Sequence, residues 1–271
     1  MSNLLCRLRG HLVTAGLRLG WMCVALMGLA GHAAAAELSV TAPNAVKDAL
    51  LVIAADFEKQ SGHRVTFAWG GSEAITRRVA EGAVLDVVVN SPQGMEQLQA
   101  QGKLADGART AFARSGVAVA VRSGAPRPDI STVAGLKAAL LGAESIAISS
   151  GASGRYLEQL FQRLGVAEQI QKKIKQPPSG AQIGEMLARG EAELGFQQVT
   201  ELMHAKGFDY IGTLPAEVQN YTVWSAAPHL SAPSADAARR TARGRAIGFR
   251  HASGRGLPRR CGNGLDRKSV V

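Results

Sequence analysis

Short clusters of glycine, serine, asparagine and proline recur along the chain, each directly after an apolar run of strand length. Such clusters open helices, whose first backbone N–H groups lack partners within the helix, and small residues let a ligand approach that backbone. Several helix starts at the ends of neighbouring strands therefore predict a cleft for an anion. The clusters are PNA at 43–45, GGS at 70–72, NSPQG at 90–94, GASG at 151–154 and PPSG at 177–180.

Signals for catalysis or metal binding are weak by comparison. GASGR at 151–155 approaches the nucleophile turn G-x-S-x-G, but Arg155 stands where the second glycine is required. The three histidines of the body show no metal-ligand spacing. They are His63, His204 and His229. We expect no enzyme activity, no cofactor and no bound metal, and keep a secreted hydrolase with Ser153 as nucleophile as an alternative.

The net charge of +10 lies at the two ends of the chain. Residues 1–36 hold three arginines and no acid, and residues 239–271 hold nine arginines, one lysine and one aspartate. Removing these from the 31 basic and 21 acidic residues leaves 18 basic and 20 acidic residues in 37–238. Because this body is slightly acidic, we expect no nucleic-acid partner.

Residues 1–36 are predicted to be a cleavable export signal. A basic opening is followed by the apolar run LGWMCVALMGLA at 19–30 and by small residues that offer a cleavage site near Ala36. A dozen or so apolar residues are fewer than the roughly 20 that span a bilayer. The body at 37–238 has no cysteine, so an exported domain would depend on its hydrophobic core rather than on disulfides.

Apolar runs of strand length alternate with segments of helical period, which predicts an α/β fold. Asn44 is expected to cap the helix after the first strand. Leu157, Leu160 and Phe161 would form the core face of a helix that ends at Gly165. The predicted strands include LSVTA at 38–42, the alternating run at 65–69, LDVVVN at 85–90, GVAVAV at 116–121 and SIAISS at 145–150.

Over about residues 37–230, the order and spacing of several blocks resemble the periplasmic molybdate-binding protein family, the solute-binding components of ABC importers. The blocks are SVTAPNAVKDAL with FEKQSG, FAWGGSEAITRRVAEGAVLDVVV, SGASGRYLEQLFQRLG, and SGAQIGEMLARGEAELGFQQVTEL followed by IGTLPAEVQ. The resemblance implies a type II periplasmic binding protein fold. Two lobes, each a mixed five-stranded sheet flanked by helices, would be joined by crossing strands near GVAVAVRS and VQNYTVWSA. Lobe one would hold 37–120 and 221–238, and lobe two 121–220.

The resemblance also assigns anion contacts, which fall on Asn44, Ala45, Gly71, Ser72, Ser153, Gly180 and Gln198. Two positions depart from the family pattern, because a serine hydroxyl is common where PNA stands and a tyrosine hydroxyl where Gln198 stands. The amides of Asn44 and Gln198 can donate hydrogen bonds instead. Arg77, Arg78 and Arg155 are interpreted as solvated or steering charges, whereas an Arg155 that faced the cleft would favour a carboxylate or larger ligand.

We therefore expect a monomeric periplasmic protein that binds molybdate, another oxyanion or a small anionic solute. Its partners would be the membrane subunits of an ABC importer. A non-transport protein that senses an anion is a further alternative.

The chain end departs from the resemblance after residue 238, where the family continues with an apolar helix. Residues 239–271 instead contain six glycines and nine arginines without a sustained period. We interpret this stretch as the product of a reading-frame shift near Arg239 or Arg240, because out-of-frame GC-rich DNA tends to encode Arg, Gly, Ala and Pro. A disordered basic extension is the alternative.

Overall fold

The computed structural model describes residues 35–203 and 206–242. Almost all of the expected export signal at 1–36, and the tail from residue 243 onward, lie outside the described residues. Among the helices described, none has both the length and the apolar character needed to cross a membrane.

Nine strands in the described residues follow the order β2-β1-β3-β9-β4-β7-β5-β6, with β8 beside β4. The pairs β1–β2, β1–β3, β5–β6 and β5–β7 are parallel, and the pairs made by β4 and β9 are antiparallel. The pairing is therefore mixed, as expected. The bounds are β1 Glu37–Pro43, β2 Arg64–Gly70, β3 Val87–Asn90, β4 Thr110–Arg122, β5 Ile146–Ile148, β6 Ile174–Lys175, β7 Leu194–Gln198, β8 Phe208–Thr213 and β9 Tyr221–Pro228.

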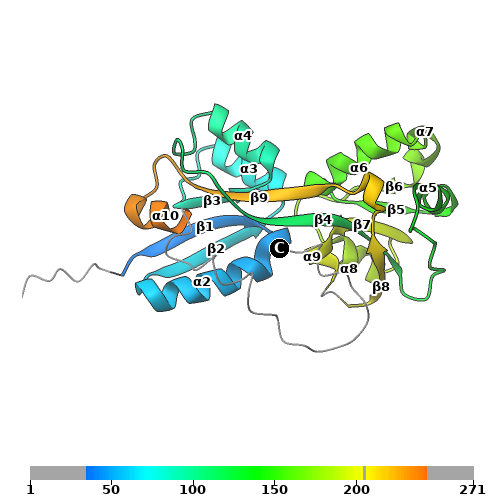
Figure 1. The fold of residues 1–271 in the computed structure, drawn as a ribbon, viewed down its shortest axis with the longest axis horizontal. Coiled ribbons are helices and arrows are strands. Elements are labelled where there is room, and N and C mark those ends of the chain that lie inside the picture. Colours follow the sequence, from blue (N-terminus) through cyan, green and yellow to red (C-terminus); the bar gives the residue numbers. More distant parts are fainter. Residues whose placement is uncertain (1–34, 204–205, 243–271) are drawn as a thin grey trace, which may run out of the picture. The chain divides into compact units, whose positions relative to one another are not determined.

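Helices follow most strands, so the chain alternates β and α elements (Figure 1). The α-helices are α2 Lys47–Ser61, α3 Ser72–Ala80, α4 Pro92–Ala100, α5 Val133–Gly142, α6 Ala152–Arg163, α7 Ala167–Ile170, α8 Ile183–Ala188, α9 Val199–Leu202 and α10 Ala235–Ala242. The 3-10 helices are η1 Asn44–Val46, η2 Gln171–Lys173 and η3 Ala216–Val218.

Strand β4 takes part in two separate sets of strand pairs. Its residues 110–116 pair with β9, and its residues 117–122 pair with β7 and β8. Figure 1 shows β4 and β9 running side by side. We call residues 36–116 and 221–242 the first half, and residues 117–220 the second half. The change of partner falls between Gly116 and Val117, slightly before the expected lobe boundary at 120.

In the first half, alternate residues of β3 face helices on opposite sides of the sheet. Val87 and Val89 belong to a buried cluster with Leu50 and Phe57 of the α2 region. Val88 lies in another buried cluster, with side chains of α3 and α4. Figure 1 shows α2 on one side of these strands, and α3 and α4 on the other. A strand buried on both faces explains the continuous apolar run in the sequence.

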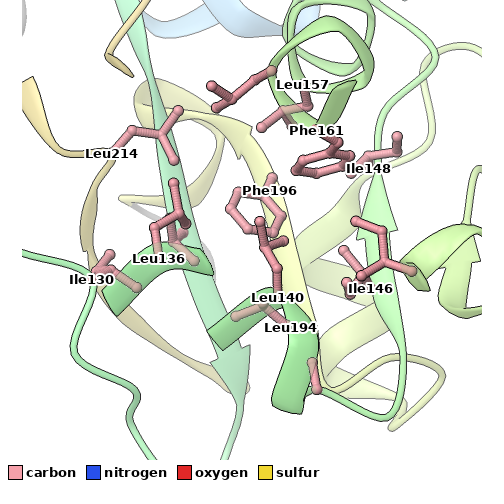
Figure 2. Packing of buried hydrophobic residues seen from close by; sticks show 14 of the residues in the cluster. Ile130, Leu136, Leu140, Ile146, Ile148, Leu157, Phe161, Leu194, Phe196 and Leu214 are labelled. Carbon is pink, nitrogen blue, oxygen red and sulfur yellow. The ribbon is translucent and has the colours of Figure 1, made fainter. Parts of the chain in front are cut away.

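In the second half, β4 alternates valine and alanine, and each type faces its own helices. Val117, Val119 and Val121 pack in a cluster with residues of α5 and α6. Figure 2 shows part of this cluster, with Phe161 of α6 close to Phe196 of β7. The small residues Ala118 and Ala120 face α8 and α9. The sheet therefore fixes α6 on one face, and α8 and α9 on the other.

The second crossing strand, expected near residues 218–226, is observed as β9, which begins three residues later at Tyr221. The residues before it, 214–220, contain Pro215 and η3. Proline has no N–H to donate to a sheet. Gln219 replaces the missing backbone pairing, because its Oε1 accepts from the N–H of Val117 at 2.8 Å and its Nε2 donates to the oxygen of Val117 at 2.9 Å.

Two local expectations also differ from the structure. Asn44 does not cap the following helix: it opens η1, and the residue at the N-cap of α2 is Val46. At the chain end, α10 extends through residue 242, beyond the point where the sequence analysis began the irregular tail. Ala237 and Ala238 of α10 are buried in the first half.

Candidate functional site

A cavity of about 40 Å³ lies between segments of the two halves. All seven residues that the sequence analysis assigned to an anion site line it: Asn44, Ala45, Gly71, Ser72, Ser153, Gly180 and Gln198. They lie at or after the carboxyl ends of β1, β2, β5 and β7, and in the loop before α8. A buried water needs about 10–15 Å³, so the cavity suits a compact ligand of a few non-hydrogen atoms.

The first half contributes the start of α3. Gly71 is the N-cap residue of this helix and has no side chain to cap it, and Ser72 is its buried first residue. Ser179 Oγ of the second half accepts from the N–H of Ala74 in the first turn at 3.3 Å. The N–H groups of that turn have no partners within the helix, and the helix dipole is positive at this end. The turn can therefore donate hydrogen bonds to an anion.

The NSPQG cluster at 90–94 does not line the cavity. Instead, Asn90 is fully buried behind α3, where its Nδ2 donates to the backbone oxygen of Ser72 at 3.2 Å and to Thr76 Oγ1 at 2.8 Å. A Cβ on Gly94 would lie 2.4 Å from Asn90 Nδ2. The NSPQG cluster therefore holds Ser72 in position from behind and does not line the cavity.

The second half contributes the start of α6, the GASG segment. Gly151 is the N-cap residue, and it has no side chain to cap the helix. Gly154 is required there, because a Cβ would lie 1.5 Å from the backbone oxygen of Ser149. The hydroxyls of Ser149 and Ser153 are 3.0 Å apart. One hydroxyl proton serves that contact, which leaves the other available to a ligand.

The two halves touch at the rim of the cavity. An added Cβ on Gly71 would lie 2.2 Å from Ser179 Oγ and 2.6 Å from the nitrogen of Gly180. Asn44 Nδ2 donates to the oxygen of Gly180 at 3.1 Å, which explains why this side chain does not cap a helix. Thr200 Oγ1 donates to the oxygen of Ala45 at 2.6 Å. These contacts hold the two halves close together around the cavity.

Gln198 lines the cavity, but its amide is used within the protein. In the orientation that satisfies both amide groups, its nitrogen donates to the oxygen of Ser115 at 2.9 Å and its oxygen accepts from Thr222 Oγ1 at 3.0 Å. The side chain is 2% exposed. The resemblance implies that this amide donates to the ligand; in the structure it hydrogen bonds to Ser115 of β4 and Thr222 of β9 instead.

Nine further lining residues were not among the assigned contacts. Four of them belong to the small-residue clusters found in the sequence: Pro43, Gly70, Gly151 and Ala152. Of the other five, Ser149, Ala181 and Gln197 are near assigned residues in the sequence. Glu201 and Trp224 have no such local signal, because the short helix α9 and the pairing of β9 bring them to the cavity.

Arg155 lies at the start of α6 but does not line the cavity. Its Nη1 is 2.5 Å from Glu73 Oε1, so the pair connects α6 to α3 across the two halves. The two side chains are 33% and 45% exposed. Arg77 is exposed and Arg78 is partly buried, and neither lines the cavity. Among the described lining residues there is no lysine, arginine or histidine.

The titratable side chain in the described cavity wall is Glu201. Burial raises the pKa of its carboxyl from 4.5 to about 7. Hydrogen bonds from the side chains of Gln182 and Gln197 and from the backbone of Gln198 oppose this rise, because they favour the charged form. The carboxyl therefore titrates near neutral pH.

Among the described residues, the side-chain partner of Ser153 is Ser149, and no hydrogen bond joins a histidine to either serine. The described residues contain no group of three or more His, Cys, Asp or Glu side chains that could hold a metal ion. His204 lies outside the described residues.

A family model described as bacterial extracellular solute-binding protein matches residues 38–241. An aconitate isomerase from a Pseudomonas species is 34% identical over 229 residues, covering 82% of this chain and 87% of that protein. A molybdate-binding protein from Rhodobacter capsulatus is 28% identical over 196 residues, with coverages of 70% and 76%.

The solved structure of the periplasmic molybdate-binding protein of Azotobacter vinelandii matches with a TM-score of 0.64 at 25% identity. The match covers 82% of this chain and 100% of that chain. These similarities confirm the resemblance inferred from the sequence and the mixed α/β fold expected with it.

The raised pKa of Glu201 predicts how stability depends on pH. The folded protein binds this proton more tightly than the unfolded chain, so the contribution to stability is complete below about pH 4.5 and is lost as the pH rises through about 7. Over this range the free energy of unfolding of the wild type should fall more steeply than that of Glu201→Gln, by at most about 1.4 kcal/mol per pH unit. Urea unfolding at stepped pH measures both slopes.

Glu185→Gln on α8 is the matched control, because that carboxyl is 68% exposed and should leave the wild-type slope unchanged. Equal slopes for the wild type and Glu201→Gln would contradict the burial of an ionisable group at this position.

Proposed function

Because this chain belongs to the bacterial extracellular solute-binding protein family, we propose that it captures a small anion in the cavity and delivers it to the membrane subunits of an ABC importer. The observation that supports this most is the convergence of two helix starts, of α3 and α6, on one cavity, each with a glycine as its N-cap residue. The protein would act as a monomer in the periplasm, after removal of the export signal at 1–36.

Neutral donors suffice for such a site. A hydrogen bond to a charged group contributes about 1.5–3 kcal/mol, and several of them together can exceed an association cost of roughly 4–15 kcal/mol. The remainder reaches the −8 kcal/mol or so of a micromolar complex when the donors are held in position beforehand. Asn90 behind Ser72 and Gly154 beside Ser149 hold them in that way.

The two halves would behave as two lobes that open and close about β4 and residues 214–220. Ligand exchange requires movement, because the backbones of Gly71 and Gly180 nearly touch at the rim. The contacts between Asn44 and Gly180 and between Arg155 and Glu73 would form on closure. In this proposal Ser72 donates from lobe one and Ser153 from lobe two, so a bound anion favours the closed form.

A compact oxyanion such as molybdate is the ligand class that we infer. The small cavity volume and the lack of a lysine or arginine among its described lining residues support this choice over a multiply charged carboxylate. Similarity to proteins named as molybdate-binding supports it as well. The engaged amides of Asn44 and Gln198 leave the backbone N–H groups and the serine hydroxyls as the principal donors.

A second candidate function is isomerisation of a small unsaturated acid. It is favoured by the 34% identity to a protein named aconitate isomerase and by the carboxyl of Glu201 in the cavity wall. Moving a double bond requires removal of a proton from one carbon and delivery of a proton to another, and a general base works best with a pKa near the working pH. The pKa of Glu201 of about 7 meets that condition.

The binding proposal predicts that a side chain added at position 71, at the rim of the cavity, weakens anion binding. The wild type should bind at least one of molybdate, tungstate, sulfate or a small organic anion with a Kd in the micromolar range. Calorimetry measures this binding, as does tryptophan fluorescence, because Trp224 lines the cavity. Gly71→Ala should raise that Kd at least about tenfold, equivalent to about 1.4 kcal/mol, because its Cβ collides with the backbone of Gly180.

Gly142→Ala at the end of α5 is the control, because this glycine does not line the cavity and its Cβ would meet nothing within 4 Å. It should bind nearly as the wild type does. Unchanged affinity in Gly71→Ala would refute the role of closure, and a wild type that binds none of these anions would refute the proposed function.

The two functions are separated by incubating the protein with cis-aconitate in D₂O and following the proton NMR spectrum. The binding proposal predicts an unchanged spectrum over hours. Formation of the trans isomer with deuterium incorporation, abolished in Glu201→Gln and retained in Glu185→Gln, would instead establish the isomerase.

A further inference from the structure

Glu201 is an acidic side chain in the wall of a cavity whose other polar groups suit an anion. It lines the cavity together with Ser72 and Ser153. An ionised carboxylate and a bound anion repel each other, most strongly where water is excluded. The site therefore needs a cation or a proton between the two groups.

The carboxyl is held in the wall by a chain of amides. Gln197 Oε1 accepts from the N–H of Ile183 at 2.9 Å, which fixes the orientation of this amide. Its Nε2 therefore faces Glu201 and donates to Oε1 at 2.9 Å. Held by this amide, the carboxyl keeps a fixed position in the cavity wall.

No cation among the described residues neutralises Glu201. Helix α9, which carries Glu201, packs on η1, β4 and β7, and α8 directly follows Gln182 in the chain. The segments η1 and β7 contain no charged residue. On β4, Arg114 lies over the ring of Tyr221 and Arg122 is exposed. On α8, Glu185 pairs with Arg189. At the rim, Arg155 pairs with Glu73.

We propose that Glu201 and the bound anion share one proton, and that this makes Glu201 a specificity-determining residue of the site. The inference rests on the proposed function. The proton comes from the carboxyl or from the ligand, whichever holds it at the prevailing pH. At low pH the cavity accepts fully deprotonated oxyanions such as molybdate, because Glu201 donates. At high pH it prefers an anion that brings its own proton, such as hydrogen phosphate.

The raised pKa of Glu201, about 7, places this change of preference near neutral pH. Above that pH, binding of molybdate requires uptake of one proton from solvent, so its affinity falls about tenfold per pH unit. Hydrogen phosphate needs no such uptake. The ratio of phosphate to molybdate affinity therefore rises with pH.

Calorimetric titration with molybdate and with inorganic phosphate at about pH 6 and about pH 8.5 tests the inference. Each titration is run in two buffers of different ionisation heat, which counts the protons taken up. At the higher pH the wild type should take up close to one proton per molybdate and none per hydrogen phosphate. Glu201→Gln should take up none, and there it should bind molybdate at least about tenfold more tightly than the wild type.

The gain of affinity in Glu201→Gln separates a shared proton from a structural role, which would only weaken binding. Glu185→Gln should reproduce the wild-type pH profile. The proton count on the wild type needs no variant, so a poorly folding Glu201→Gln leaves the test intact. Molybdate binding without proton uptake above pH 7 overturns the inference and leaves the proposed function standing. If neither anion binds at either pH, the inference is overturned, and binding of tungstate, sulfate and small organic anions then decides the proposed function.

Discussion

The backbones of Gly71 and Gly180 lie so close that a side chain at position 71 would collide with the other half. The starts of α3 and α6 line the same small cavity, and the N-cap residue of each helix is a glycine. Gly180 has φ +95°, which glycine adopts readily, so the segment before α8 can turn toward Gly71. Much of the geometry of the site follows from this contact.

The rest of the fold holds the two helix starts in place. The alternation of β3 fixes α2 on one face of the sheet, and α3 and α4 on the other. The valines and alanines of β4 do the same for α6 on one side and α8 and α9 on the other. Because β4 belongs to both sets of pairs, the halves share a continuous strand. Gln219 completes the second connection through its side chain. Side-chain pairing at a crossing point leaves fewer backbone bonds to break if the halves rotate.

Local patterns predicted the class of fold and much of the cavity wall. Glycine and serine after apolar runs located the starts of α3 and α6, because helix starts and their small residues are local features. Local patterns could not predict which groups Asn44, Gln198 and the 90–94 cluster contact. The side chain of Asn44 meets Gly180, which is far away in sequence, and the amide of Gln198 meets β4 and β9. Glu201 was missed because its place in the cavity wall depends on how α9 turns after β7. A carboxylate also runs against the expectation for an anion site, and a shared proton removes that conflict.

The central claim is that an anion sits between the helix starts of the two halves, and a crystal structure with bound tungstate tests it most directly. Tungsten scatters anomalously, so its position is found without assumption about the site. The account predicts one strong anomalous peak in the cavity, within hydrogen-bonding reach of both Ser72 and Ser153, in a closed form. A peak elsewhere on the protein, or an empty cavity at a tungstate concentration that saturates binding in solution, would contradict it.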